Sequence, residues 1–96
     1  MNLKESLKFI RDTIYRYLPA EEYEAFIYGS RADGTAEKWS DIDVGIRGKG
    51  KISLINLGLI EEELRESDVP YLVNVADFSR ISEEFGKLAL KKVIKL

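Results

Sequence analysis

Residues 28–44 read YGSRADGTAEKWSDIDV, and the first part of this stretch predicts a strand–turn–helix corner. The apolar residues 25–28 have the composition of a short buried strand that ends at Gly29, and residues 31–33 have that of a helix start. Such a corner directs free backbone N–H groups and the positive end of the helix dipole at one point, which suits a phosphate. Gly29 lets the backbone approach that phosphate closely. Ser30 either donates a hydroxyl hydrogen bond to it or simply caps the helix of an ordinary turn.

The end of the stretch carries a pair of carboxylates, Asp41 and Asp43. They alternate with the apolar Ile42 and Val44, which predicts a half-buried strand with both carboxylates on its outer face. Two such charges repel by roughly 4 kcal/mol at an effective dielectric constant of about 20, so a cation between them is favourable. Oxygen ligands of this kind suit Mg²⁺ or Mn²⁺. The alternative is an exposed strand face with two ordinary solvated carboxylates.

The Gly-Ser turn followed by Ser-Asp-Ile-Asp resembles the signature of the nucleotidyltransferase superfamily typified by DNA polymerase β. Within that superfamily the chain is similar to the minimal nucleotidyltransferases (MNT), small stand-alone domains, and the resemblance extends over nearly the whole chain. It implies a nucleotide site at Gly29, Ser30, Arg31 and Ser40, and a metal site at Asp41 and Asp43 that also serves catalysis.

The family also uses a third carboxylate on a later strand, and here the matching position is Asn74. The resemblance therefore places Asn74 in the catalytic set beside the two aspartates. An amide cannot accept a proton as a carboxylate base does, and it binds cations weakly. Asp77 is an alternative source of the missing charge, although its odd spacing from Asn74 assigns it to the opposite face of the strand.

The reaction that the resemblance implies is transfer of AMP from ATP to a hydroxyl group, with two Mg²⁺ (or Mn²⁺) ions. A chain this short has no room for its own acceptor-binding domain, so a partner is expected to bring the acceptor. The resemblance implies that this partner is a HEPN-domain toxin and that the acceptor is one of its tyrosines. The protein would then act as the antitoxin. The alternative is a catalytically weakened module that binds nucleotide and partner and neutralises the HEPN protein by contact, because Asn74 replaces the third carboxylate.

Composition limits the other classes of function. At 96 residues, of which 45% are hydrophobic, the chain is expected to form a single domain over residues 1–96 with an adequate core. The absence of Cys and His argues against disulfides, thiolate chemistry and most zinc sites. A net charge of −2 argues against broad nucleic-acid binding. We expect a cytoplasmic protein, because the sequence has neither a signal peptide nor an apolar run of about 20 residues.

The apolar pattern predicts an α/β (α+β) fold in which a small mixed sheet of three to four strands packs against helices. Helices are expected over residues 3–18, 52–67 and 82–94, with a short one between Gly29 and Gly34, and strands over residues 24–28, 42–46 and 71–77. The expected inner positions of the two later long helices are Leu54, Leu57, Ile60 and Leu64, then Phe85, Leu88, Ala89 and Val93. Leu90, Ile94 and Leu96 are expected to be exposed and to permit self-association.

Two further features have alternative interpretations. Trp39 either packs locally beside the strand or stacks on a base or a partner protein. The Gly- and Lys-rich residues 47–51 form either a solvated turn or a cationic loop that approaches the triphosphate.

Overall fold

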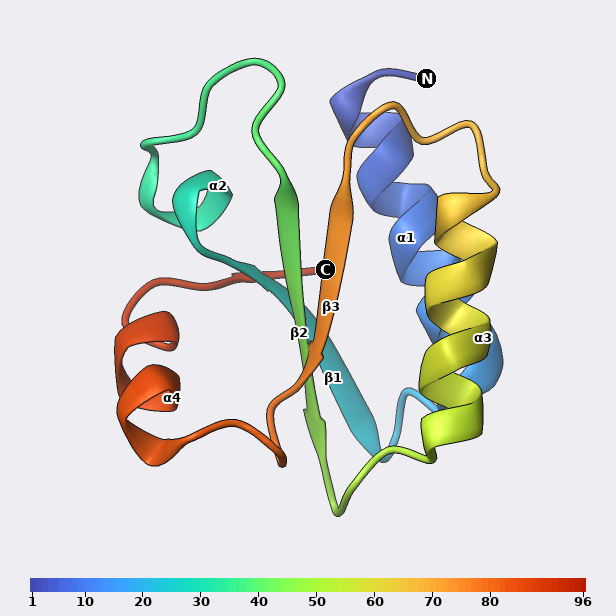
Figure 1. Ribbon diagram of the computed structural model, residues 1–96, viewed down its shortest axis with the longest axis vertical. Coiled ribbons are helices and arrows are strands. Elements are labelled where there is room, and N and C mark those ends of the chain that lie inside the picture. Colours follow the sequence, from blue (N-terminus) through green and yellow to red (C-terminus); the bar gives the residue numbers. More distant parts are fainter.

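The computed structural model describes residues 1–96, which form four helices and four strands. In chain order the elements are α1 (Leu3–Tyr17), β1 (Tyr23–Tyr28), α2 (Ser30–Asp33), β2 (Ile42–Gly48), α3 (Leu54–Arg65), β3 (Val73–Asp77), α4 (Glu83–Ala89) and β4 (Ile94–Lys95). Figure 1 shows α1 and α3 together on one side of the sheet, with α2 and α4 on the other.

The four strands form one mixed sheet in the order β3-β2-β1-β4, which confirms the predicted fold class. Strand β1 is antiparallel to both β2 and β4, whereas β2 and β3 are parallel. In the parallel pair Asp43 lies opposite Asn74, so the two positions singled out in the sequence are neighbours across the central strands.

The hydrophobic core lies between the sheet and the α1–α3 pair. Ile42, Val44 and Ile46 of β2 are fully buried there, together with Ile10 and Ile14 of α1. The alternation predicted for β2 is therefore confirmed, and it leaves the side chains of the intervening residues on the opposite face of the sheet.

That opposite face carries a cluster of aromatic rings. The rings of Phe26 and Tyr28 lie 4.9 and 5.1 Å from that of Phe78, and Tyr28 also lies 6.0 Å from Phe85 of α4. The rings meet edge to face, an arrangement that is favourable for aromatic pairs. This cluster attaches α4 to the sheet.

Gly45 makes room for the aromatic cluster, so we expect Gly45→Ala to destabilise the fold. An added Cβ would lie 2.5 Å from ring atoms of Phe26 and 2.6 Å from Phe78. Overpacking of this kind costs about 1–3 kcal/mol of unfolding free energy. Gly58→Ala is the control: it lies within α3 with open space around it, so alanine there should stabilise the helix by up to about 1 kcal/mol. Urea denaturation measures both, and equal stability of the two variants would contradict this packing.

The C-terminal region differs from the prediction. The helix expected over residues 82–94 begins after its Ser82 cap but ends at Ala89, and Ile94–Lys95 form strand β4 instead. Ile94 pairs with Ile27, and the Leu96 N–H donates to the carbonyl of Ala25. The free edge of β1 thus supplies hydrogen-bond partners that override the helical spacing of the apolar residues.

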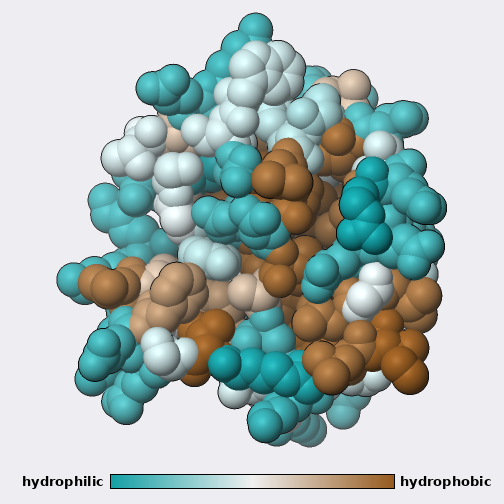
Figure 2. Space-filling view, viewed as in Figure 1, coloured by the Kyte–Doolittle hydropathy of each residue, from teal (hydrophilic) through white to brown (hydrophobic).

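The predicted inner face of α3 is also partly wrong. Ile60 and Leu64 are buried as expected, but Leu54 is 69% exposed. Helix α3 begins only after the Ser53 cap, and the residue just before that cap, Ile52, fills the core instead. The exposed start of α3 contributes to the hydrophobic area at the lower right of Figure 2.

None of the helices is long and apolar enough to span a lipid bilayer.

Candidate functional site

Three polar side chains from β2, β3 and the residue before β2 meet on the outer face of the sheet. The Nδ2 group of Asn74 donates to Oδ1 of Asp43 at 3.0 Å and to Oδ2 of Asp41 at 3.3 Å. The parallel register sets this meeting point, because it places Asn74 directly opposite Asp43. The structure therefore brings together the whole catalytic set expected from the sequence.

The arrangement fits a hard divalent cation. One nitrogen reaches an oxygen of each carboxylate, so the two carboxylates are close enough to share a single positive group. Turning the Asn74 amide about its last torsion angle would present its oxygen in place of its nitrogen, which adds a neutral ligand. Two carboxylates with an amide oxygen are ligands that Mg²⁺ and Mn²⁺ accept.

Gly29 packs its backbone directly against this site. Its φ of 72° and ψ of −152° lie in a region that side-chain-bearing residues rarely adopt. An added Cβ would lie 2.5 Å from Oδ2 of Asp43. Glycine is therefore required at this position for two reasons: the conformation of the turn and the close approach of the backbone to the carboxylate.

Ser30 is the first residue of α2, which is only four residues long. Its carbonyl accepts the N–H groups of Gly34, Thr35 and Ala36, and this closes the helix at Gly34 as predicted. The side chain lines a hollow beside Leu3 of α1, separate from the one that Gly29 and Asp43 line.

Arg31 and Ser40 hold the loop that leads into Asp41. The Arg31 guanidinium donates to the carbonyl of Ser40 at 2.8 Å and to that of Lys38 at 3.1 Å, and it lies over the ring of Tyr71. The Ser40 hydroxyl accepts the N–H of Glu37. Sequence reasoning missed this positioning role, because backbone carbonyl acceptors leave no signal in the sequence. Their predicted contact with the nucleotide stays a prediction.

Trp39 in the same loop is only partly packed. Its ring lies 5.6 Å from that of Tyr71, yet 63% of the residue is exposed. The local packing of Trp39 is thus confirmed in part, whereas its stacking on a base or a partner protein stays a prediction. Residues 49–51 follow β2 as an exposed turn, with no lysine ion pair.

Asp77 does not replace the missing carboxylate, and that alternative is wrong. It pairs with Ile46, three positions along β2 from Asp43, and its side chain is buried on the opposite face. Its oxygens accept hydrogen bonds from the Ile52 N–H, from Ser79 and from Arg80. Burial alone would raise the pKa of Asp77, but these donors outweigh it and lower the pKa below its usual value.

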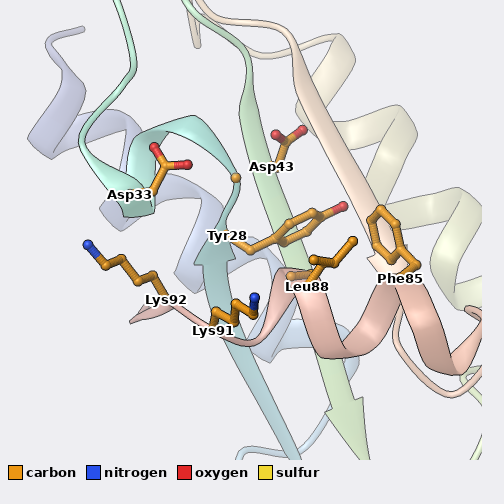
Figure 3. Close-up of a pocket in the computed structure, with 9 residues that line it drawn as sticks. Tyr28, Asp33, Asp43, Phe85, Leu88, Lys91 and Lys92 are labelled. Atoms are coloured by element: carbon orange, nitrogen blue, oxygen red, sulfur yellow. The ribbon is translucent and has the colours of Figure 1, made fainter.

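A cavity of about 560 Å³ opens beside Asp43 on the outer face of the sheet (Figure 3). Its walls come from β1, α2, β2 and the end of α4, and the lining residues are Tyr28, Gly29, Asp33, Asp43, Phe85, Leu88, Ala89, Lys91 and Lys92. Burial raises the pKa of the Tyr28 hydroxyl, and the Asp43 carboxylate raises it further. Phe85 and Leu88 were expected in the core, but they are 44% and 67% exposed and form the wall of this cavity.

Comparisons with known proteins identify the family and the fold of the chain. The Haemophilus influenzae protein named "probable protein adenylyltransferase MntA" is 29% identical over 87 residues, which cover 91% of this chain and 75% of that protein. A toxin–antitoxin crystal structure with AMP-PNP superposes with a TM-score of 0.70 at 19% identity, covering 94% of this chain and 70% of the other. A structure of the tri-AMPylated Shewanella oneidensis HEPN toxin with its MNT antitoxin gives a TM-score of 0.71 at 14% identity, covering 96% and 69%. Residues 14–96 match the family model described as "Polymerase beta, Nucleotidyltransferase", and the chain belongs to this family.

Proposed function

We propose that the chain is a protein adenylyltransferase that transfers AMP from ATP to a tyrosine of a HEPN-domain toxin and so acts as its antitoxin. The observation that carries the proposal is the meeting of Asp41, Asp43 and Asn74 beside the Gly29 turn in a member of this family. It is supported by the MntA relative and by the similarity to structures of toxin–antitoxin complexes.

Each residue of the site has a definite task in this reaction. Asp41 and Asp43 would hold Mg²⁺ or Mn²⁺, with the amide of Asn74 as a neutral third ligand. When bound, the ion neutralises phosphate charge and lowers the pKa of the attacking hydroxyl. Gly29 keeps the backbone close to the carboxylates, so that the nucleotide can lie against the turn. Arg31 holds the loop that positions Asp41.

The tyrosine oxygen forms a bond with the α-phosphorus of ATP, and the bond from that phosphorus to the β-phosphate oxygen breaks. Pyrophosphate leaves, and the hydroxyl proton passes to solvent or to a carboxylate of the Asp pair. Residue 74 cannot accept that proton, because an amide has no basic oxygen comparable to a carboxylate. We therefore expect the AMP-transfer step to be slow when residue 74 is asparagine.

Asn74 also favours a second candidate function. A catalytically weakened module that binds nucleotide and neutralises the HEPN toxin by contact alone needs no third carboxylate. It predicts a stable complex without any covalent change in the toxin.

The intact mass of the HEPN partner distinguishes the two functions. A candidate HEPN-domain partner is incubated with ATP, Mg²⁺ and this protein, and is then analysed by mass spectrometry. The adenylyltransferase function predicts that the mass of the partner increases by one or more AMP groups, which peptide mapping locates on tyrosine. An unmodified partner that is nevertheless inhibited in a stable complex would establish the contact-only function instead.

We expect Asn74→Asp to increase the rate of AMP transfer by at least about ten-fold, or roughly 1.4 kcal/mol of activation free energy. The new carboxylate restores a base and a charged ligand. It also replaces an amide donor with a third negative charge, so the variant should depend more strongly on Mg²⁺ for its thermal stability. Rates and melting temperatures are measured with and without Mg²⁺.

Asn2→Asp is the matched control for this variant. It makes the same chemical change at an exposed position, and aspartate caps a helix as well as asparagine does. A rate increase in both variants, or in neither, would contradict the role given to residue 74.

A further inference from the structure

We propose that Lys91 and Lys92, which follow α4, bind the β- and γ-phosphates of the nucleoside triphosphate in the cavity beside Asp43. This inference rests on the proposed function and names the residues that would hold the polyphosphate end of its substrate. The cavity volume of about 560 Å³ lies in the range of pockets that enclose small ligands.

The charges around the cavity are unevenly distributed. Asp43 and Gly29 form one side, where the α-phosphate must react, and the two lysines form another. Figure 3 shows the ring of Tyr28 between these sides, with Lys91 below it and Lys92 below Asp33. A triphosphate that starts at Asp43 would therefore extend toward two ammonium groups.

The two ammonium groups are free to bind a ligand. Neither lysine forms an ion pair, whereas Lys87 pairs with Glu83 and Lys95 with Glu24. An ammonium group without a carboxylate partner interacts more strongly with a phosphate, because its charge is not already compensated. Lysine binds a phosphate as a point charge. Both residues are exposed, so a ligand can reach both ammonium groups.

Asp33 is the one carboxylate on the same side of the cavity, and it is already engaged. It accepts the N–H and the hydroxyl of Thr35 at 2.9 and 2.6 Å. These hydrogen bonds lower the pKa of Asp33, and the charge of Lys92 adds to the effect. Lys92 thus offsets the repulsion that Asp33 would exert on a phosphate, which leaves Lys91 as the more direct ligand.

The segment with the lysines is anchored at both ends. Before it, Phe85 packs against Tyr28 and Phe78, and after it, Ile94 pairs with Ile27 in the sheet. Two anchors so close in sequence limit the positions available to residues 90–93 and keep the ammonium groups near the cavity. Residues that merely complement the dipole at the end of α4 would need no such cavity.

The test is calorimetric titration with AMP-PNP and with AMP, both in the presence of Mg²⁺. We expect the double variant Lys91→Ala/Lys92→Ala to weaken AMP-PNP binding at least about ten-fold and to leave AMP binding unchanged, because AMP lacks the two outer phosphates. Lys91→Ala should have the larger share of the effect, and Lys91→Arg should retain most of the affinity. Lys87→Ala changes a lysine that lies within α4, outside this cavity, and this variant should bind like the natural protein.

Several outcomes would overturn the inference. These are unchanged AMP-PNP affinity in the double variant, equal weakening for AMP and AMP-PNP, or no binding of AMP-PNP by the natural protein. If the alanine variants do not fold, the Lys91→Gln/Lys92→Gln pair is tested in the same way. The proposed function fails separately, when AMP-PNP binding depends on the lysines but no AMP is found on the partner.

Discussion

Asp43→Ala is expected to reduce AMP transfer by at least about a hundred-fold, which corresponds to roughly 2.7 kcal/mol of activation free energy. Asp43 is the residue on which the site converges: it accepts from Asn74, it lies against Gly29, and it lines the cavity. Its removal leaves Asp41 as the only carboxylate for a divalent cation. The measurement is the rate at which the partner gains mass in the presence of ATP and Mg²⁺.

The fold should tolerate this change. The sheet pairing of Asp43 with Tyr28 and Asn74 is made by the backbone, and the amide of Asn74 keeps its contact with Asp41. Removing one of two like charges also relieves repulsion, so the free energy of unfolding without Mg²⁺ should not fall. Asp68→Ala, at an exposed position without an ion pair, is the control. Undiminished labelling by a folded Asp43→Ala protein would refute the assignment of the metal site.

The part of the site that the sequence predicted is the part encoded by local pattern. Alternation along β2 places Asp41 and Asp43 on one face, and only glycine suits the backbone at position 29. The position of Asn74 followed from the family resemblance, and the parallel register of β2 and β3 brings it to the carboxylates. These features depend on residues that lie close together in the chain or opposite one another in the sheet.

The C-terminal wall of the cavity could not be predicted in the same way. Strand β4 has two residues, too few to show an alternating pattern, and it forms because the edge of β1 is free. Phe85 and Leu88 have the spacing of core positions, yet they line an open cavity. Since that wall was not foreseen, the presence of Lys91 and Lys92 in the same cavity as Asp43 was not foreseen either.

Asp77→Ala is expected to lower the free energy of unfolding by about 1–3 kcal/mol, mainly because it leaves a buried N–H group without a hydrogen-bond partner. The Asp77 side chain is 2% exposed and is paired with Arg80 at 2.7 Å. It also accepts the N–H of the buried Ile52 at 2.9 Å, which joins the end of β3 to the start of the α3 segment. Alanine would leave that N–H without a partner and Arg80 without its counter-charge. Small proteins have about 5–15 kcal/mol of stability in total, so urea denaturation should show a large shift.

The pH dependence of Asp77→Asn separates the role of charge from that of shape. The native pKa of Asp77 lies below that of an ordinary aspartate, about 3.9, so the folded protein holds a proton at this site less readily than the unfolded chain. The ionised carboxylate therefore contributes stability above about pH 4, and that contribution is lost as the pH falls through the native pKa. The stability difference between the natural protein and Asp77→Asn should be largest near pH 7 and should shrink below about pH 4. A difference that stays constant over this interval would mean that Asp77 stabilises the fold through packing alone, and that its hydrogen bonds with Ile52 and Arg80 do not depend on its charge.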